Sequence, residues 1–148
     1  MSFHRALACA AALLASACTP GGVTGSGSSN TPTSPQVTKI DVNLTLNQGG
    51  YAPSPARVAV GSFVQFVNSD GFAHTATGIP GATGFPASSP FSVSAQQQSG
   101  STISGSWSSG TLQASQSSQV ISVDAAGTYY YGCFFHYGAP MRGPIVAQ

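Results

Sequence analysis

Apolar and polar side chains alternate regularly over residues 37–46, and this alternation strongly limits the possible folds. This two-residue period predicts a β-strand with one buried face. Shorter runs rich in β-branched and aromatic residues follow at 57–60, 62–67, 128–133 and 142–147, with Gly and Pro between them. No segment has apolar residues at three-and-four spacing over the length of a helix. The pattern therefore predicts an all-β fold, either a sandwich or a barrel.

Two further parts of the pattern bear on the fold. Residues 119–123 and 128–133 flank a turn-like segment at 124–127, and this arrangement predicts a β-hairpin. Residues 78–119 are rich in Ser, Gln and Gly, which is compatible with two or three weak strands or with a long excursion over the surface. Trp107 is the only Trp, and we expect it to fill the core.

Residues 1–18 have the organisation of an export signal. A short segment with Arg5 precedes an apolar run at 6–14, and small residues lead to Cys18. The apolar run is too short to span a bilayer. The residues before Cys18 resemble a bacterial lipobox, which predicts cleavage there and lipidation of the thiol; they also suit ordinary signal peptidase. We expect a lipoprotein anchored to a membrane on the extracytoplasmic side, in the periplasm or at the cell surface.

The rest of the chain divides into a tether and one domain. Residues 19–35 consist mainly of Gly, Ser, Thr and Pro and are expected to form a flexible tether. Residues 36–148 contain the strand-like runs and are long enough for one domain. Charged residues are scarce, with 4 Lys and Arg against 3 Asp and Glu. This balance argues against nucleic-acid binding and against strong electrostatic steering of a partner.

Four side chains have the chemistry of metal ligands. Cys133, His136 and Met141 lie in one short segment, and His74 follows the strand-like run at 62–67. The chain has three His and three Cys, and only these two His and this Cys lie outside the leader. One thiolate, two imidazoles and a weak thioether ligand are typical of a blue-copper electron-transfer site. The alternatives are an inert buried thiol at Cys133, a loop histidine without a partner at His74, and a core-filling Met141.

Two segments carry a family resemblance. The sequence GFAHT at 71–75 is similar to the GFPHN ligand loop of cupredoxins of the plastocyanin/azurin class. The sequence GTYYYGCFFHYGAPMRG at 127–143 is similar to the second ligand loop of that class, GTYxxxCxxHxxxxMxG. This resemblance implies a Greek-key β-sandwich that holds one type-1 copper ion. The implied ligands are His74, Cys133 and His136 in the equatorial plane and Met141 in the axial position.

The chain departs from the family motifs at several positions. Ala73 replaces the proline before the first ligand, and Thr75 replaces an Asn that helps to tie the two ligand loops together. Phe134 and Phe135 are bulkier than the usual residues between Cys and His. We expect these departures to change the reduction potential rather than copper binding. Asp70, beside the first loop, is interpreted as a turn former.

The resemblance implies a monomeric carrier that passes single electrons between transient redox partners. His136 is then the exit port for the electron. The docking patch implied around it consists of Phe72, Ala73, Phe135, Gly138, Ala139 and Pro140. With His74 and His136 both used, no histidine of the domain remains for a second copper centre, which argues against an enzyme. The alternatives are a Cu(I) carrier or storage module, for which two Met residues are few, and a binding module with a vestigial site.

Overall fold

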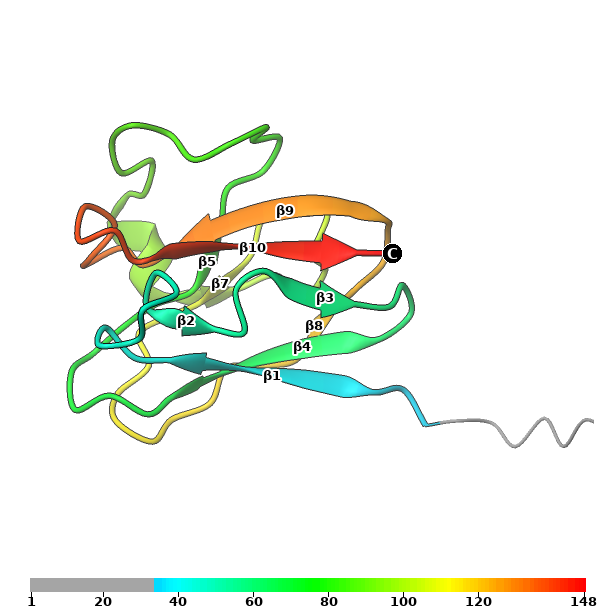
Figure 1. Ribbon diagram of the computed structural model, residues 1–148, viewed down its shortest axis with the longest axis horizontal. Helices are drawn as coiled ribbons and strands as arrows, with labels where there is room; N and C mark the ends of the chain where they lie inside the picture. Colours follow the sequence, from blue (N-terminus) through cyan, green and yellow to red (C-terminus); the bar gives the residue numbers. More distant parts are fainter. Residues whose placement is uncertain (1–33) are drawn as a thin grey trace, which may run out of the picture. The chain divides into compact units, whose positions relative to one another are not determined.

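The computed structural model describes residues 34–148, which form two β-sheets packed face to face (Figure 1). Apart from the short 3-10 helix η1 (Val93–Gln96), these residues form strands, turns and loops. The predicted all-β sandwich is therefore confirmed. No helix within this described part is long and apolar enough to cross a membrane. The predicted signal peptide at 1–18, the lipidation site Cys18 and most of the tether at 19–35 lie outside the described residues.

The first sheet is mixed and has four strands. In spatial order these are β2 (Tyr51–Ala52), β1 (Val37–Val42), β4 (Phe63–Asn68) and β8 (Ile121–Ser122). β1 and β4 pair in parallel along their whole length, and β8 pairs antiparallel with β4. Because alternate side chains of a strand share a face, the buried Ile40 of β1 and its register partner Phe66 of β4 point into the core.

The second sheet has six strands and carries the C-terminal ladder. In spatial order these are β3 (Ala56–Val58), β10 (Arg142–Ala147), β9 (Gly127–Gly132), β5 (Thr77–Gly78), β7 (Ser108–Ser109) and β6 (Gln98–Ser99). β9 and β10 pair antiparallel along all of their residues, and β10 also pairs in parallel with β3. The strand predicted at 142–147 is confirmed with the same bounds.

Aromatic rings fill the space between the two sheets. Trp107 is 2% exposed, and its ring stacks on Phe66 with 5.5 Å between centroids and 21° between the planes. Tyr131 of β9 packs edge-on against Phe66 at 5.1 Å. Since Phe66 belongs to the first sheet and Tyr131 to the second, this cluster joins the two layers. The expectation that Trp107 fills the core is confirmed.

The first strand is shorter than predicted. β1 ends at Val42, although the alternation continues to residue 46. The Oδ1 atom of Asn43 accepts hydrogen bonds from the backbone N–H of Thr45 at 3.0 Å and from its hydroxyl at 2.7 Å. The carbonyl of Asn43 also accepts a bond from the N–H of Leu46 at 3.0 Å. These local bonds turn the chain and remove the segment from the ladder.

The predicted hairpin is wrong, because β8 and β9 lie in different sheets. The backbone of β8 pairs with β4 on one side and with an irregular segment on the other. There the N–H of Ser122 donates to Ser101 O at 2.7 Å, and the N–H of Ile103 donates to Ser122 O at 2.9 Å. Asp124 accepts a bond from the N–H of Ser104 at 3.1 Å. The turn-like segment therefore crosses from one sheet to the other.

Residues 78–119 contain both short strands and an excursion over the surface, the two possibilities predicted from the sequence. Their second half contains the short strands β6 and β7, whereas their first half is an excursion over the second sheet. The carbonyl of Pro86 accepts hydrogen bonds from the hydroxyl of Tyr137 at 2.9 Å and from Nη1 of Arg142 at 3.3 Å. These contacts hold the excursion against the loop that joins β9 to β10.

Candidate metal centre

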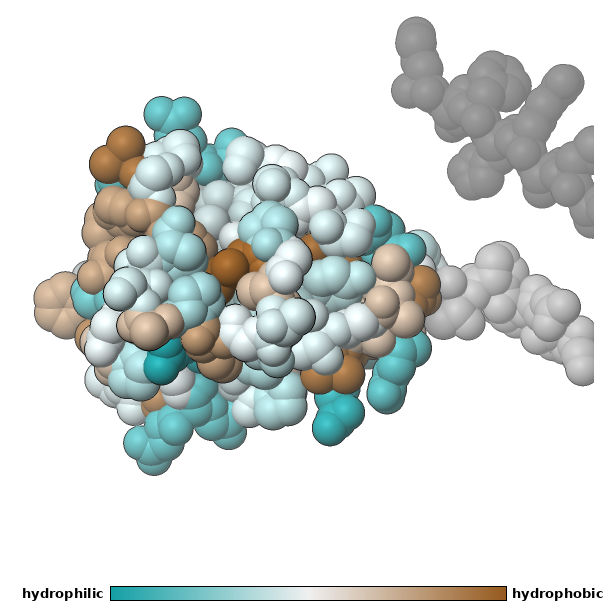
Figure 2. Space-filling model, turned by 90° about the horizontal axis from the view of Figure 1, so that it is seen from above, coloured by the Kyte–Doolittle hydropathy of each residue, from teal (hydrophilic) through white to brown (hydrophobic). Residues whose placement is uncertain are grey.

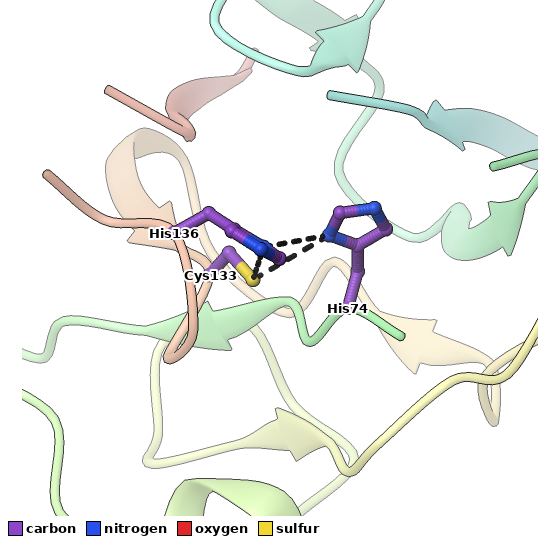
Figure 3. Close-up of side chains that lie close together, drawn as sticks. All are labelled: His74, Cys133 and His136. Atoms are coloured by element: carbon purple, nitrogen blue, oxygen red, sulfur yellow. Dashed lines mark hydrogen bonds between the residues drawn. The ribbon is translucent and has the colours of Figure 1, made fainter. Parts of the chain in front are cut away.

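His74, Cys133 and His136 converge where the loop between β9 and β10 meets the loop after β4 (Figure 3). Cys133 directly follows β9, and His136 lies three residues later in the same loop. His74 is held by paired backbone hydrogen bonds to Leu112. The Sγ atom of Cys133 lies 3.8 Å from Nδ1 of His74 and 3.6 Å from Nδ1 of His136, and the two Nδ1 atoms are 3.1 Å apart.

The donor set of this cluster fits copper. Nε2 of His74 lies 2.9 Å from Oδ2 of Asp70, so the proton of the neutral ring belongs on Nε2, and the lone pair of Nδ1 faces the cluster. Two imidazole nitrogens and a sulfur that face one another are natural ligands for a single cation. A trigonal arrangement of one thiolate and two imidazoles is the one that blue-copper sites use.

Met141 is buried beside this cluster and belongs to the same tight loop. The N–H groups of Ala139 and Met141 both donate to His136 O, at 2.9 and 3.0 Å, and the N–H of Cys133 donates to Met141 O at 3.0 Å. Gly50, for which the sequence carries no signal, leaves room for the thioether. A Cβ atom added there would lie 2.6 Å from Cγ of Met141, and its φ of +74° also favours glycine.

Thr75 ties the two ligand loops together. Its hydroxyl oxygen accepts a hydrogen bond from the N–H of Phe134 at 2.8 Å, and its own N–H points at Sγ of Cys133 from 3.4 Å. Its carbonyl accepts a bond from the buried hydroxyl of Tyr51 at 2.6 Å. The Thr that stands in place of the family's Asn therefore still links the loops, and it also donates to the sulfur.

We expect Thr75→Val to destabilise the protein, because it removes the acceptor for the N–H of Phe134 while keeping the side-chain shape. The expected loss in the free energy of unfolding is about 1–3 kcal/mol. Denaturant unfolding of the copper-free protein measures this loss. Thr75→Ser, which retains the hydroxyl, is the matched control and should retain most of the stability. Equal losses in the two variants would contradict the assigned role of the hydrogen bond.

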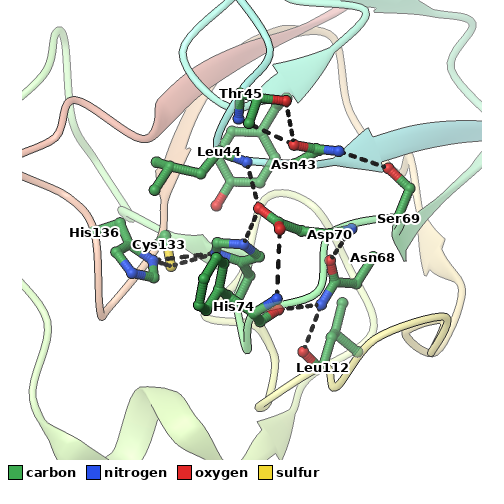
Figure 4. Close-up of polar contacts among 12 residues, drawn as sticks. Asn43, Leu44, Thr45, Asn68, Ser69, Asp70, His74, Leu112, Cys133 and His136 are labelled. Atoms are coloured by element: carbon green, nitrogen blue, oxygen red, sulfur yellow. Dashed lines mark hydrogen bonds and ion pairs between the residues drawn. The ribbon is translucent and has the colours of Figure 1, made fainter.

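Asp70 and Asn68 organise the loop that carries His74 (Figure 4). The amide nitrogen of Asn68 donates to Phe72 O at 2.8 Å and to Leu112 O at 2.9 Å, and its Oδ1 accepts a bond from the N–H of Asp70 at 2.9 Å. Asp70 is thus part of the turn, as interpreted from the sequence. The sequence did not predict that the carboxylate of Asp70 contacts Nε2 of His74. Two residues four positions apart in a loop, unlike in a helix, need not lie side by side.

The surroundings shift the protonation of two groups in the site. Burial of the ring, followed by the proximity of His74, lowers the pKa of His136. Hydrogen bonds from the N–H of Leu44 and then from the side chain of His74 lower the pKa of Asp70. Both shifts favour the forms that a metal site needs, which are a neutral imidazole at His136 and an ionised carboxylate at Asp70.

Apolar side chains of both ligand loops are exposed. Phe72 is 69% exposed and Phe135 is 41% exposed. The other members of the docking patch expected from the sequence are also accessible, with Ala73 partly buried and Gly138, Ala139 and Pro140 exposed. Figure 2 shows apolar surface gathered at the left end of the molecule, where Figure 1 has the loop between β9 and β10. Ligand-type side chains and an apolar surface thus lie at the same end of the sandwich.

Comparisons with known proteins agree with this chemistry. Residues 38–148 match the family of copper binding proteins described as plastocyanin/azurin. Among solved structures, the purple cupredoxin from Nitrosopumilus maritimus is similar, with 18% identity and a TM-score of 0.50 over 74% of this chain and 98% of that one. A reduced amicyanin variant has 21% identity and a TM-score of 0.49, over 76% and 82%. No curated protein sequence matches the chain significantly.

These findings confirm the expected fold and the expected cofactor. The likeness to the purple cupredoxin shows the fold, a Greek-key β-sandwich. The family match extends over nearly all of the described residues and includes both ligand loops. The proteins of that family are described as copper-binding. The chain therefore belongs to the plastocyanin/azurin family of copper-binding proteins.

Proposed function

We propose that this protein is a type-1 copper electron carrier in which His74, Cys133 and His136 are the equatorial ligands and Met141 is the axial one. The observation that carries the proposal is the triangle of one sulfur and two Nδ1 atoms, with edges of 3.1, 3.6 and 3.8 Å. Family members are typically electron carriers. Both histidines of the domain are used in this site, so an additional catalytic copper centre has no histidine to draw on.

Bound copper would supply reversible one-electron exchange. The residues around it keep the ligands in place when the charge changes. The buried His74 is held through both its backbone and its ring, and the sulfur of Cys133 accepts a hydrogen bond from Thr75. The bonds from Ala139 and Met141 to His136 O close the other ligand loop. A site held in this way would change little between oxidation states, and Met141 and the bond to sulfur would tune its potential.

The docking patch is the surface through which redox partners would bind. Four of its six residues belong to the loop of His136, and none of the six is charged. A small apolar surface without charge gives little steering and suits short-lived encounters with redox proteins. The protein would act as a monomer that alternates between a donor and an acceptor.

The N-terminal residues support a location at a membrane, outside the cytoplasm. We include in the proposal that Cys18 is the lipidated residue and that residues 19–35 tether the domain to a membrane. Family members are usually extracytoplasmic, and the export signal proposed for residues 1–18 agrees with that location. A tether rich in Gly and Ser would let the domain reach partners on the same membrane.

Copper loading tests the proposed function. We expect the protein to bind one equivalent of Cu(II) and to become intensely blue, to lose the colour on addition of ascorbate, and to regain it with ferricyanide. A colourless protein that retains only Cu(I) would instead favour a carrier or storage module. A protein that binds copper in neither state would identify the site as vestigial. Stoichiometry by metal analysis and the visible spectrum distinguish these three outcomes.

A further inference from the structure

The ring of His74 is held from both of its nitrogens. Nδ1 faces Cys133 and His136, and Nε2 lies 2.9 Å from Oδ2 of Asp70 (Figure 4). The side chain of His74 is fully buried, and that of Asp70 is only 10% exposed. A carboxylate therefore lies directly behind one of the proposed ligands, in a place with little access to water.

The carboxylate of Asp70 is itself fixed by its neighbours. Its Oδ2 also accepts a hydrogen bond from the N–H of Leu44 at 2.9 Å, and its Oδ1 accepts one from the N–H of Phe72 at 3.4 Å. Within residues 34–148, no Lys or Arg forms an ion pair with it. Among the described residues, its negative charge is thus stabilised by hydrogen bonds alone, including the one from the ring of His74.

We propose that Asp70 is a positioning residue that orients His74 toward copper and lowers the reduction potential of the site. This inference rests on the proposed function. Since Asp70 accepts the Nε2 proton, it selects the tautomer whose Nδ1 lone pair faces the metal, as carboxylates behind metal-bound histidines do. Its fixed negative charge stabilises the oxidised ion, which carries the larger positive charge, more than the reduced ion.

Two substitutions separate orientation from charge. Asp70→Asn keeps the shape and an acceptor oxygen but removes the charge, whereas Asp70→Ala removes both. The matched control is Asp124→Asn, because Asp124 also accepts a bond from the backbone of another loop, at Ser104. Asp124 precedes β9, whereas Cys133 follows it. A strand of six residues places these two ends about 20 Å apart.

The first readout is the reduction potential of the copper-loaded, full-length protein. We expect Asp70→Asn to raise it by an amount that corresponds to about a tenfold change in the electron-exchange equilibrium with a reference couple, which is about 59 mV for one electron. Asp124→Asn should leave the potential nearly unchanged. A shift in Asp70→Asn no larger than that in Asp124→Asn would overturn the assigned effect of the charge.

The second readout needs no metal. Nitrogen-15 NMR of the copper-free protein reports which ring nitrogen of His74 carries the proton. We expect the Nε2–H tautomer in the wild type and in Asp70→Asn, and a loss of this preference in Asp70→Ala. An unchanged tautomer in Asp70→Ala would refute the positioning role. If wild-type protein formed no blue Cu(II) site, the proposed function and the effect on the potential would both fail, while the NMR result would still decide the positioning role.

Discussion

Replacing Cys133 with alanine is expected to abolish the intense visible absorption of the copper-loaded protein. That absorption requires charge transfer between the thiolate and Cu(II), and Cys133 is the only cysteine of residues 36–148. Copper affinity should fall by more than the roughly 10–100-fold that is typical when an outer-shell partner of a metal ligand is lost. Visible spectroscopy and a copper titration measure the two effects.

A matched variant separates the role of the thiolate from general damage to the site. Met141→Leu conserves volume in a buried position and removes only the proposed weak axial ligand. It should keep the intense band, with a changed reduction potential. Persistence of the band in Cys133→Ala would contradict the proposed ligand set. Circular dichroism of both variants verifies that the sandwich is intact.

Trp107→Ala is expected to destabilise the protein strongly. The indole is 2% exposed, stacks on Phe66 and lies so close to Gly78 that an added Cβ atom there would be 2.6 Å from Nε1. Its removal leaves a cavity between the two sheets that the surrounding strands cannot fill. We expect the free energy of unfolding to fall by about 3–5 kcal/mol. Urea unfolding of the copper-free protein measures this loss.

An exposed aromatic residue is the control for this prediction. Phe72→Ala truncates a side chain that is 69% exposed, so it should change the free energy of unfolding by no more than about 0.5 kcal/mol. Equal losses in Phe72→Ala and Trp107→Ala would mean that the ring cluster does not join the layers as the packing indicates. Because Phe72 also belongs to the docking patch, the same variant is available for measurements of electron exchange.

The parts of the fold that could be predicted are those set by local patterns. The strand at 142–147 was predicted with its observed bounds, because alternation and the pairing ladder coincide there. The strand at 37–46 was predicted too long, because the alternation continues after the side chain of Asn43 has turned the chain. The hairpin prediction failed because spacing and turn residues do not reveal which sheet a strand joins.

The candidate site also has parts that the sequence predicts and parts that it does not. Cys133, His136 and Met141 were recognisable because they lie in one short loop, and His74 because its loop resembles a known motif. The bond between Thr75 and the N–H of Phe134 was not predictable from spacing, since it joins two separate loops. The space that Gly50 leaves for Met141 and the contact between Asp70 and His74 had no sequence signal of their own.

The chemistry of the site can be read from the residues alone: the kinds of donor atoms, their spacing along the second loop, and the period that makes the chain β-structured. The folded arrangement was needed to show which strands share a sheet, how closely the two imidazoles approach the sulfur, and which carboxylate lies behind His74. The difference lies in the range of the interactions. Periodicity and turn chemistry act between near neighbours in the chain, whereas hydrogen bonds between loops exist only after the sheets have packed.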